Sequence, residues 1–214
     1  MKFVLWFAFM GAVSVCLGQE SEGHVIPFAS KGNTVELAVE NTATVTSSNV
    51  TVELKNKPAW AMFNSEKEVI TELPGQTESK IVFVFSVDKT APIGQKEKLV
   101  FTVSSTNGQT WSKEISVSVG PPDKFELFQN YPNPFNPSTT IAYQLTTDSR
   151  IRLKIYNLLG QEVVTLLDGD RLAGFHQEVW NASSVASGTY IYRLIATDAS
   201  GKEVVEKKVM TLVK

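Results

Sequence analysis

Residues that could carry chemistry are scarce in this chain of 214 amino acids. The histidines are His24 and His176, and the single cysteine, Cys16, lies in an apolar N-terminal run. A catalytic triad or a zinc site needs several such groups close together. The sequence also lacks the GxSxG, P-loop, GxGxxG and HExxH motifs. It therefore predicts a protein that is not an enzyme, with no cofactor and no metal site.

One acidic motif, Asp168-Gly169-Asp170, has the spacing that begins a calcium-binding loop. Arg171 and Leu172 follow it, where such a loop would supply further oxygen ligands. We therefore interpret the motif as a solvated turn.

Trp60 and Trp111 are the side chains best suited to stacking on a ligand. Exposed together on one sheet face, they would stack on sugar rings, as in carbohydrate-binding modules. Buried, they would anchor a core, and the sequence favours this interpretation. A carbohydrate-binding module that uses Trp60 and Trp111 therefore remains an alternative function, and a small hydrolase is a weaker one.

The N-terminus has the pattern of a secretory signal peptide. Lys2 supplies a positive charge, an apolar run follows to Val15, and Cys16 and Gly18 are small residues suited to cleavage before Gln19. The run is shorter than the roughly 20 apolar residues that span a bilayer. We therefore expect a cleaved signal at 1–18 and no transmembrane segment in the mature chain. A lipoprotein modified at Cys16 is less favoured, because bulky Val15 precedes the cysteine.

Removal of the signal leaves 196 of the 214 residues and no cysteine, so the mature chain would have no disulfide. Loss of Lys2 changes the formal charge from −2 to −3, unlike the strongly basic balance typical of nucleic-acid-binding proteins. This length suits two domains of about 95 residues each, folded on apolar burial alone.

Apolar residues recur with a period of two between residues 24 and 119, which predicts strands with one buried face. The alternating sets are Val35, Leu37 and Val39; Val50, Val52 and Leu54; Ile81, Phe83, Phe85 and Val87; Leu99, Phe101 and Val103; and Ile115, Val117 and Val119. Asn107-Gly108 predicts a type I′ hairpin turn between two of them. Together these features predict an antiparallel β-sandwich.

This first module also resembles the immunoglobulin-like accessory domains of bacterial surface proteins, over residues 30–119. The resemblance depends on Pro58-Ala59-Trp60, Leu73-Pro74-Gly75 and Thr90-Ala91-Pro92-Ile93-Gly94. It implies a fold and a supporting role, and it brings no catalytic residues.

Gly120-Pro121-Pro122-Asp123 ends the first module, since adjacent prolines stop sheet pairing. In the second module, Ile151, Leu153 and Ile155 alternate with basic residues. Two segments, 157–164 and 198–205, share the same turn pattern, in which Asn or Asp opens the turn and Gly160 or Gly201 returns the chain.

The second module contains a proline-rich motif, Tyr131-Pro132-Asn133-Pro134-Phe135-Asn136-Pro137. A hairpin at 155–163 that includes Gly160, then Ser187-Gly188-Thr189-Tyr190, and a basic ending with Lys207, Lys208 and Lys214 follow in order. From about Phe125 to Lys214 the chain resembles the C-terminal sorting domain of the type IX secretion system. We take these residues as the candidate sorting motif.

The resemblance implies export across the inner membrane, recognition by the outer-membrane type IX machinery, and removal of the domain by a sortase-like peptidase. We expect cleavage around residues 119–125, and strand addition as one way for a receptor to dock. Lys207, Lys208 and Lys214 would either be read by the machinery or protect a sheet edge from aggregation. Gly188 and Tyr190 are expected to shape a turn and fill a core.

The sequence thus predicts an all-β protein of two immunoglobulin-like antiparallel β-sandwich domains in tandem after a signal peptide. The expected segments are a signal at 1–18, a cargo domain at 19–120, a linker at 121–124 and a sorting domain at 125–214. We expect a secreted or cell-surface protein of a Gram-negative bacterium. Its cargo would be a structural or adhesive module with a surface glycan or protein as ligand, and nucleic acid is not an expected partner.

Overall fold

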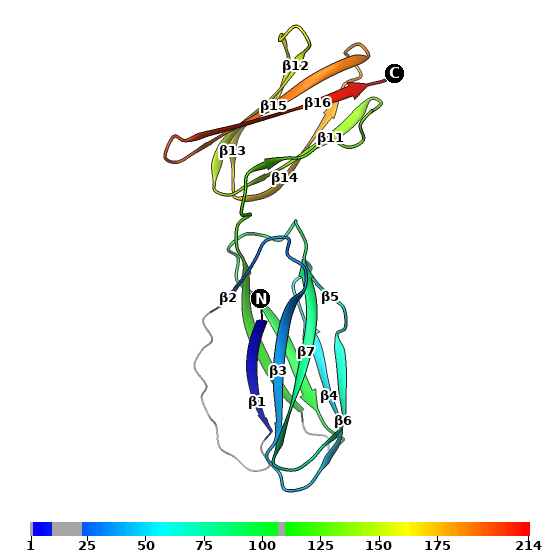
Figure 1. Ribbon diagram of the computed structural model, residues 1–214, viewed down its shortest axis with the longest axis vertical. Coiled ribbons are helices and arrows are strands. Elements are labelled where there is room, and N and C mark those ends of the chain that lie inside the picture. The colour runs from blue at the N-terminus through cyan, green and yellow to red at the C-terminus, as the bar shows by residue number, and fades with distance from the viewer. Residues whose placement is uncertain (1, 10–22, 107–109) are drawn as a thin grey trace. The chain divides into compact units, whose positions relative to one another are not determined.

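The structure, a computed structural model, describes residues 2–9, 23–106 and 110–214 (Figure 1). Every regular element in these residues is a β-strand, so the predicted all-β fold class is confirmed. None of the described residues forms a helix that could cross a membrane. The chain divides into two compact units, Met1–Gly120 and Pro121–Lys214.

The first unit is a sandwich of two sheets. Their strand orders are β1-β3-β7-β5 and β2-β9-β8-β4-β6. The strands are β1 (Lys2–Phe9), β2 (His24–Ile26), β3 (Asn33–Asn41), β4 (Ser47–Asn56), β5 (Ala61–Phe63), β6 (Lys67–Leu73), β7 (Thr77–Val87), β8 (Glu97–Ser104) and β9 (Thr110–Val119). Most pairs are antiparallel, but β1 pairs with β3, and β2 with β9, in parallel.

The core of this unit lies between the two sheets and contains the apolar sets that the period of two predicts. Each of those side chains is buried, as expected for strands with one face toward a second sheet. The expectation for the opposite face of β3 was wrong, because Glu36 and Ala38 are buried as well. The Glu36 carboxylate lies 3.2 Å from Lys80 Nζ on β7, so this buried charge has a partner.

Two sequence predictions fall wholly or partly outside the described residues. The hairpin turn at Asn107-Gly108 lies there, and so does the signal cleavage site between Gly18 and Gln19. The beginning of the predicted signal, Lys2–Phe9, forms β1 beside β3.

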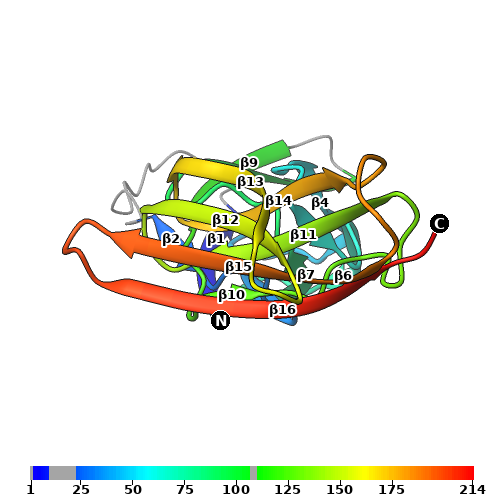
Figure 2. The ribbon, with the colours of Figure 1, turned by 90° about the horizontal axis from the view of Figure 1, so that it is seen from above.

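The second unit is also a sandwich, with sheets ordered β10-β11-β14 and β13-β12-β15-β16. Its strands are β10 (Glu126–Leu127), β11 (Ser138–Leu145), β12 (Ser149–Asn157), β13 (Glu162–Arg171), β14 (Gly174–Asn181), β15 (Gly188–Asp198) and β16 (Glu203–Leu212). Figure 2 shows the four strands of the larger sheet side by side, with β16 at one edge. A separate core fills the space between these sheets.

Two turns of the second unit form as predicted, between β12 and β13 and between β15 and β16. Asn157 Oδ1 accepts the N–H groups of Leu159 and Gln161, each at 3.0 Å. Asp198 Oδ1 accepts those of Ser200 at 2.8 Å and Lys202 at 3.0 Å. The returning glycines, Gly160 and Gly201, have φ of 77° and 83°. These are left-handed conformations that glycine adopts without steric cost.

Candidate functional site

The proline loop, residues 130–137, lies along the C-terminal part of β16. Phe135 N donates to Thr211 O at 3.0 Å, and Val213 N donates to Phe135 O at 3.0 Å. Asn133 Oδ1 accepts the N–H of Thr211 at 2.9 Å. The loop therefore occupies backbone N–H and C=O groups near the C-terminal end of the edge strand β16, which another strand could otherwise bind.

Three polar residues hold the loop from inside. Asn130 Nδ2 donates to Pro132 O at 3.0 Å and to Thr139 Oγ1 at 2.9 Å. Thr139 Oγ1 in turn donates to Pro132 O at 2.8 Å. Tyr192 OH accepts the N–H of Asn130 and donates to Phe128 O, both at 2.9 Å. Asn130, Thr139 and Tyr192 are not among the candidate sorting residues predicted from the sequence, although Asn130 immediately precedes the proline-rich motif.

Aromatic packing fixes the centre of the loop against the core. The Phe135 ring lies 5.5 Å from Trp180, and Trp180 lies 5.5 Å from Tyr190 in an edge-to-face arrangement. The Tyr190 hydroxyl donates to Ala186 O at 2.6 Å. Gly188 begins β15 opposite Leu212. Tyr190 and Gly188 thus have the structural positions that the sequence favoured, and Trp180 completes a cluster that sequence reasoning did not include.

The rest of the loop faces solvent. Tyr131 is 82% exposed, and Pro132, Asn133, Pro134 and Asn136 are also exposed. The peptide bonds before Pro132 and Pro134 are cis. A surface of defined shape, held by Asn130, Thr139 and Phe135, is therefore available to a binding partner, with Pro137 half-buried at its end.

The three candidate lysines have different environments. Lys207 is exposed, Lys208 is half-buried and points to the opposite face of β16, and Lys214 is bound at the chain end. Lys214 Nζ donates to Ser183 O at 2.8 Å and also to Val185 O. The structure therefore does not bring the three lysines together. Lys214 instead binds the backbone of the segment between β14 and β15.

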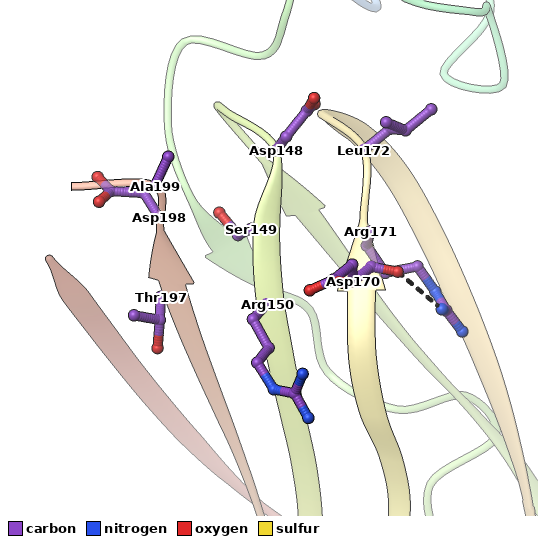
Figure 3. A pocket seen from close by; sticks show the side chains of 9 residues that line it. All are labelled: Asp148, Ser149, Arg150, Asp170, Arg171, Leu172, Thr197, Asp198 and Ala199. Atoms are coloured by element: carbon purple, nitrogen blue, oxygen red, sulfur yellow. Dashed lines mark hydrogen bonds between the residues drawn. The ribbon is translucent and has the colours of Figure 1, made fainter. Parts of the chain in front are cut away.

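A hollow of about 410 Å³ opens at one end of the larger sheet, beside the Asp168-Gly169-Asp170 motif (Figure 3). Its carboxylates belong to Asp148, Asp170 and Asp198, and they project in different directions. Asp148 Oδ1 accepts the N–H of Ala173 at 2.8 Å, and Asp198 closes its own turn.

The interpretation of Asp168-Gly169-Asp170 as a turn was wrong, because the motif lies within β13, where Asp168 pairs with Arg150 at 2.8 Å. Within the described residues, no cluster of three His, Cys, Asp or Glu side chains could hold a metal ion.

A polar cluster lies between β11, β13 and β14, in which Tyr143 is buried and Arg171, His176 and Glu178 are half-buried. The Tyr143 ring stacks on His176 at 5.3 Å, and Arg171 Nη2 lies 3.0 Å from Glu178 Oε1. Burial, with a smaller effect of the Glu178 charge, raises the pKa of Tyr143 to about 12. Because the side chain is fully buried, Tyr143 stays protonated and out of reach of a substrate.

The two candidate tryptophans, Trp60 and Trp111, do not form a stacking platform. Trp60 is 6% exposed, and its Nε1 donates to Glu97 Oε1 at 2.9 Å. Glu97, the residue that Trp60 contacts, pairs with Val117, which lies six residues and about 20 Å along β9 from half-buried Trp111. Trp60 is a core residue, so it does not present the ring face that sugar stacking requires.

Comparison with known proteins identifies the second unit. The family model of the secretion system C-terminal sorting domain matches residues 129–211. No curated protein matches the chain.

Solved structures are only weakly similar to this chain, and their TM-scores are too low to establish a shared function. Latent PorU from Porphyromonas gingivalis has a TM-score of 0.36 and 15% identity, covering 91% of this chain and 19% of PorU. The chain thus spans about a fifth of the length of PorU. The CupB2 chaperone of Pseudomonas aeruginosa has a TM-score of 0.30 and 9% identity, with 88% and 98% covered. CBD12 from CALX1.2 has a TM-score of 0.35 and 10% identity, with 81% and 77% covered.

The family match falls within the compact unit Pro121–Lys214 and includes the proline loop, Gly160, Tyr190 and Lys207. The C-terminal unit of this chain is therefore a type IX secretion system C-terminal sorting domain.

Proposed function

We propose that the protein is exported through the type IX secretion system to the surface or the medium of a Gram-negative bacterium, and that its C-terminal unit directs this export. The family match over residues 129–211 carries the proposal. The separate core of the unit supports it, because a receptor that reads shape requires a signal that folds without its passenger. The solvent-exposed proline loop offers such a shape.

The partners in this proposal are the outer-membrane machinery and a sortase-like peptidase. Cleavage falls in the connector around residues 119–125. Val119 is buried at the end of β9, whereas Pro121, Asp123 and Lys124 are exposed, so the accessible bonds lie after Gly120. Mass spectrometry of the exported protein should find a new C-terminus in this segment. An exported species that still ends at Lys214 would contradict removal of the C-terminal unit by a peptidase.

The first unit, in this proposal, is a structural or adhesive module without catalysis that binds a surface glycan or protein. Support comes from its packed core, in which the most distinctive aromatic residue, Trp60, is buried. Turnover of a substrate by the purified protein, lost when only this unit is unfolded, would contradict the non-catalytic role. The carbohydrate-binding alternative requires two exposed rings, and the burial of Trp60 does not favour it.

The sorting role is tested by fractionating a type IX host that makes the full chain or a chain ending at Gly120. We expect the full chain in the surface and medium fractions and the truncated chain in the periplasm. The variant Tyr131→Ala is a useful companion, because it alters the exposed loop without touching the core. Equal export of the full and truncated chains would refute the proposal.

A further inference from the structure

The outer face of the sheet β13-β12-β15-β16 carries a row of cations. Its side chains point away from the core, and the strand register places Lys154 opposite Arg193 and Arg193 opposite Lys207. Three basic side chains thus lie side by side on three neighbouring strands. Like charges directly opposite one another destabilise a sheet, so this row does not arise from stability alone.

Other cations on the same face have carboxylate partners. Arg150 lies 2.8 Å from Asp168, Arg152 lies 3.1 Å from Glu203, and Lys154 lies 2.7 Å from Glu162. Arg193 and Lys207 are exposed and have no ion pair within the described part of the chain. Two cations without a carboxylate partner, one on β15 and one on the edge strand β16, therefore lie on a face whose cations on β12 are paired.

Aliphatic side chains flank the two cations on both sides. Ile195 pairs with Val205 on one side, and Ile191 pairs with Val209 on the other. Val205 is 46% exposed and Val209 is 51% exposed. An arginine set among exposed aliphatic groups is typical of the energetic centre of a protein interface, which excludes water from the charges as it closes.

We propose that this face, centred on Arg193 and Lys207, is where an acidic surface of the type IX machinery docks on the sorting domain. The proposal rests on the proposed function and names the chemistry of the partner: two or more carboxylates set between aliphatic side chains. Burial of those carboxylates against the two cations would supply the missing charge partners.

A protein partner fits these observations better than an anionic membrane. Electrostatic binding to membranes requires clusters of about four to eight basic residues. Here only two cations are unmatched, and the unit Pro121–Lys214 contains ten basic and ten acidic residues, so its formal net charge is zero. Long-range attraction to a charged bilayer is therefore absent, and recognition depends on close contact.

The test compares export of the full chain carrying Arg193→Glu with Lys207→Glu and of a control carrying Lys31→Glu with Lys202→Glu. Both double variants change the formal charge by the same amount, and the exposed control residues lie in the segment between β2 and β3 and in the β15–β16 turn. We expect the first variant to be exported at least tenfold less than the natural chain, and the control less than twofold less. The thermal unfolding midpoint of the first variant should stay close to that of the natural chain, because one pair of like charges replaces another at the same cross-strand position.

Several outcomes would overturn the inference. Export of the Arg193 and Lys207 variant at the level of the control variant would overturn the docking inference. The sorting role would still stand in that case if the chain ending at Gly120 were retained in the periplasm of the same host. If the glutamate variant unfolds, Arg193→Gln with Lys207→Gln takes its place, and normal export of that variant also overturns the proposal. Binding of the natural chain to phosphatidylglycerol vesicles, abolished by the same substitutions, would replace the protein partner with a membrane.

Discussion

At the scale of single residues, the sorting domain depends on a polar contact that spans a long stretch of sequence. Tyr192 lies on β15, and its hydroxyl joins the backbone of Phe128 and Asn130, which lead into the proline loop. The tyrosine side chain is fully buried. One hydroxyl thereby satisfies a buried N–H and a buried carbonyl that no regular strand pairs.

Removing that hydroxyl with Tyr192→Phe should lower the free energy of unfolding of the C-terminal unit by about 1–3 kcal/mol, because two buried backbone groups lose their partner. Tyr156→Phe is the matched control, since Tyr156 is half-exposed on the outer face, and it should change stability by less than about 0.5 kcal/mol. Urea unfolding of both variants measures the difference. Equal midpoints would show that the contact does not stabilise the loop.

The buried tyrosines also predict an alkaline limit to stability. Burial raises the pKa of Tyr143 and of Tyr192 to about 12, against an ordinary pKa of about 10 for an exposed tyrosine. The folded state therefore keeps protons that the unfolded state loses, and the stabilisation, complete below pH 10, declines as the pH rises to 12. Unfolding free energies between pH 9 and pH 12 should fall less steeply for Tyr192→Phe than for the natural chain. Parallel curves would contradict the assigned role of Tyr192.

At the scale of elements, much of the fold was predictable because its determinants are local. The alternating apolar sets and the Asn157 and Asp198 turns each depend on residues within one or two strands. The three-residue β5 and the two-residue β10 are too short for a period of two to reveal them. The cradle of Asn130, Thr139 and Tyr192 was missed because its members meet only after the sheets pack.

The two predicted turns can be tested with alanine. Gly160→Ala and Gly201→Ala should each lower the free energy of unfolding by about 1–2 kcal/mol, since a left-handed φ crowds an alanine Cβ against the carbonyl oxygen that follows it in the chain, although the space beyond is open. Gly169→Ala on β13 is the control, because a Cβ there also meets open space but φ is not left-handed. Its stability should be unchanged or slightly higher, as measured by thermal unfolding. A similar loss at all three positions would mean that backbone conformation is not the cause.

At the scale of the whole molecule, the chain consists of two units with separate cores, and the family match lies in one of them. The sequence predicted the identity of the C-terminal unit because its motifs are ordered along the chain. It could not identify the charged outer face in advance, since Lys154, Arg193 and Lys207 come from three strands whose register only the folded sheet defines. The sequence of the first unit contains no motif that specifies a ligand.

The central claim is that residues 121–214 act as a transferable export signal. The most direct measurement joins them to the C-terminus of an unrelated periplasmic reporter that has its own signal peptide, in a host with the type IX machinery. The reporter should reach the surface or the medium, and a fusion carrying Phe135→Ala, which removes the buried anchor of the proline loop, should stay in the periplasm. Retention of the intact, folded fusion in the periplasm would contradict the claim.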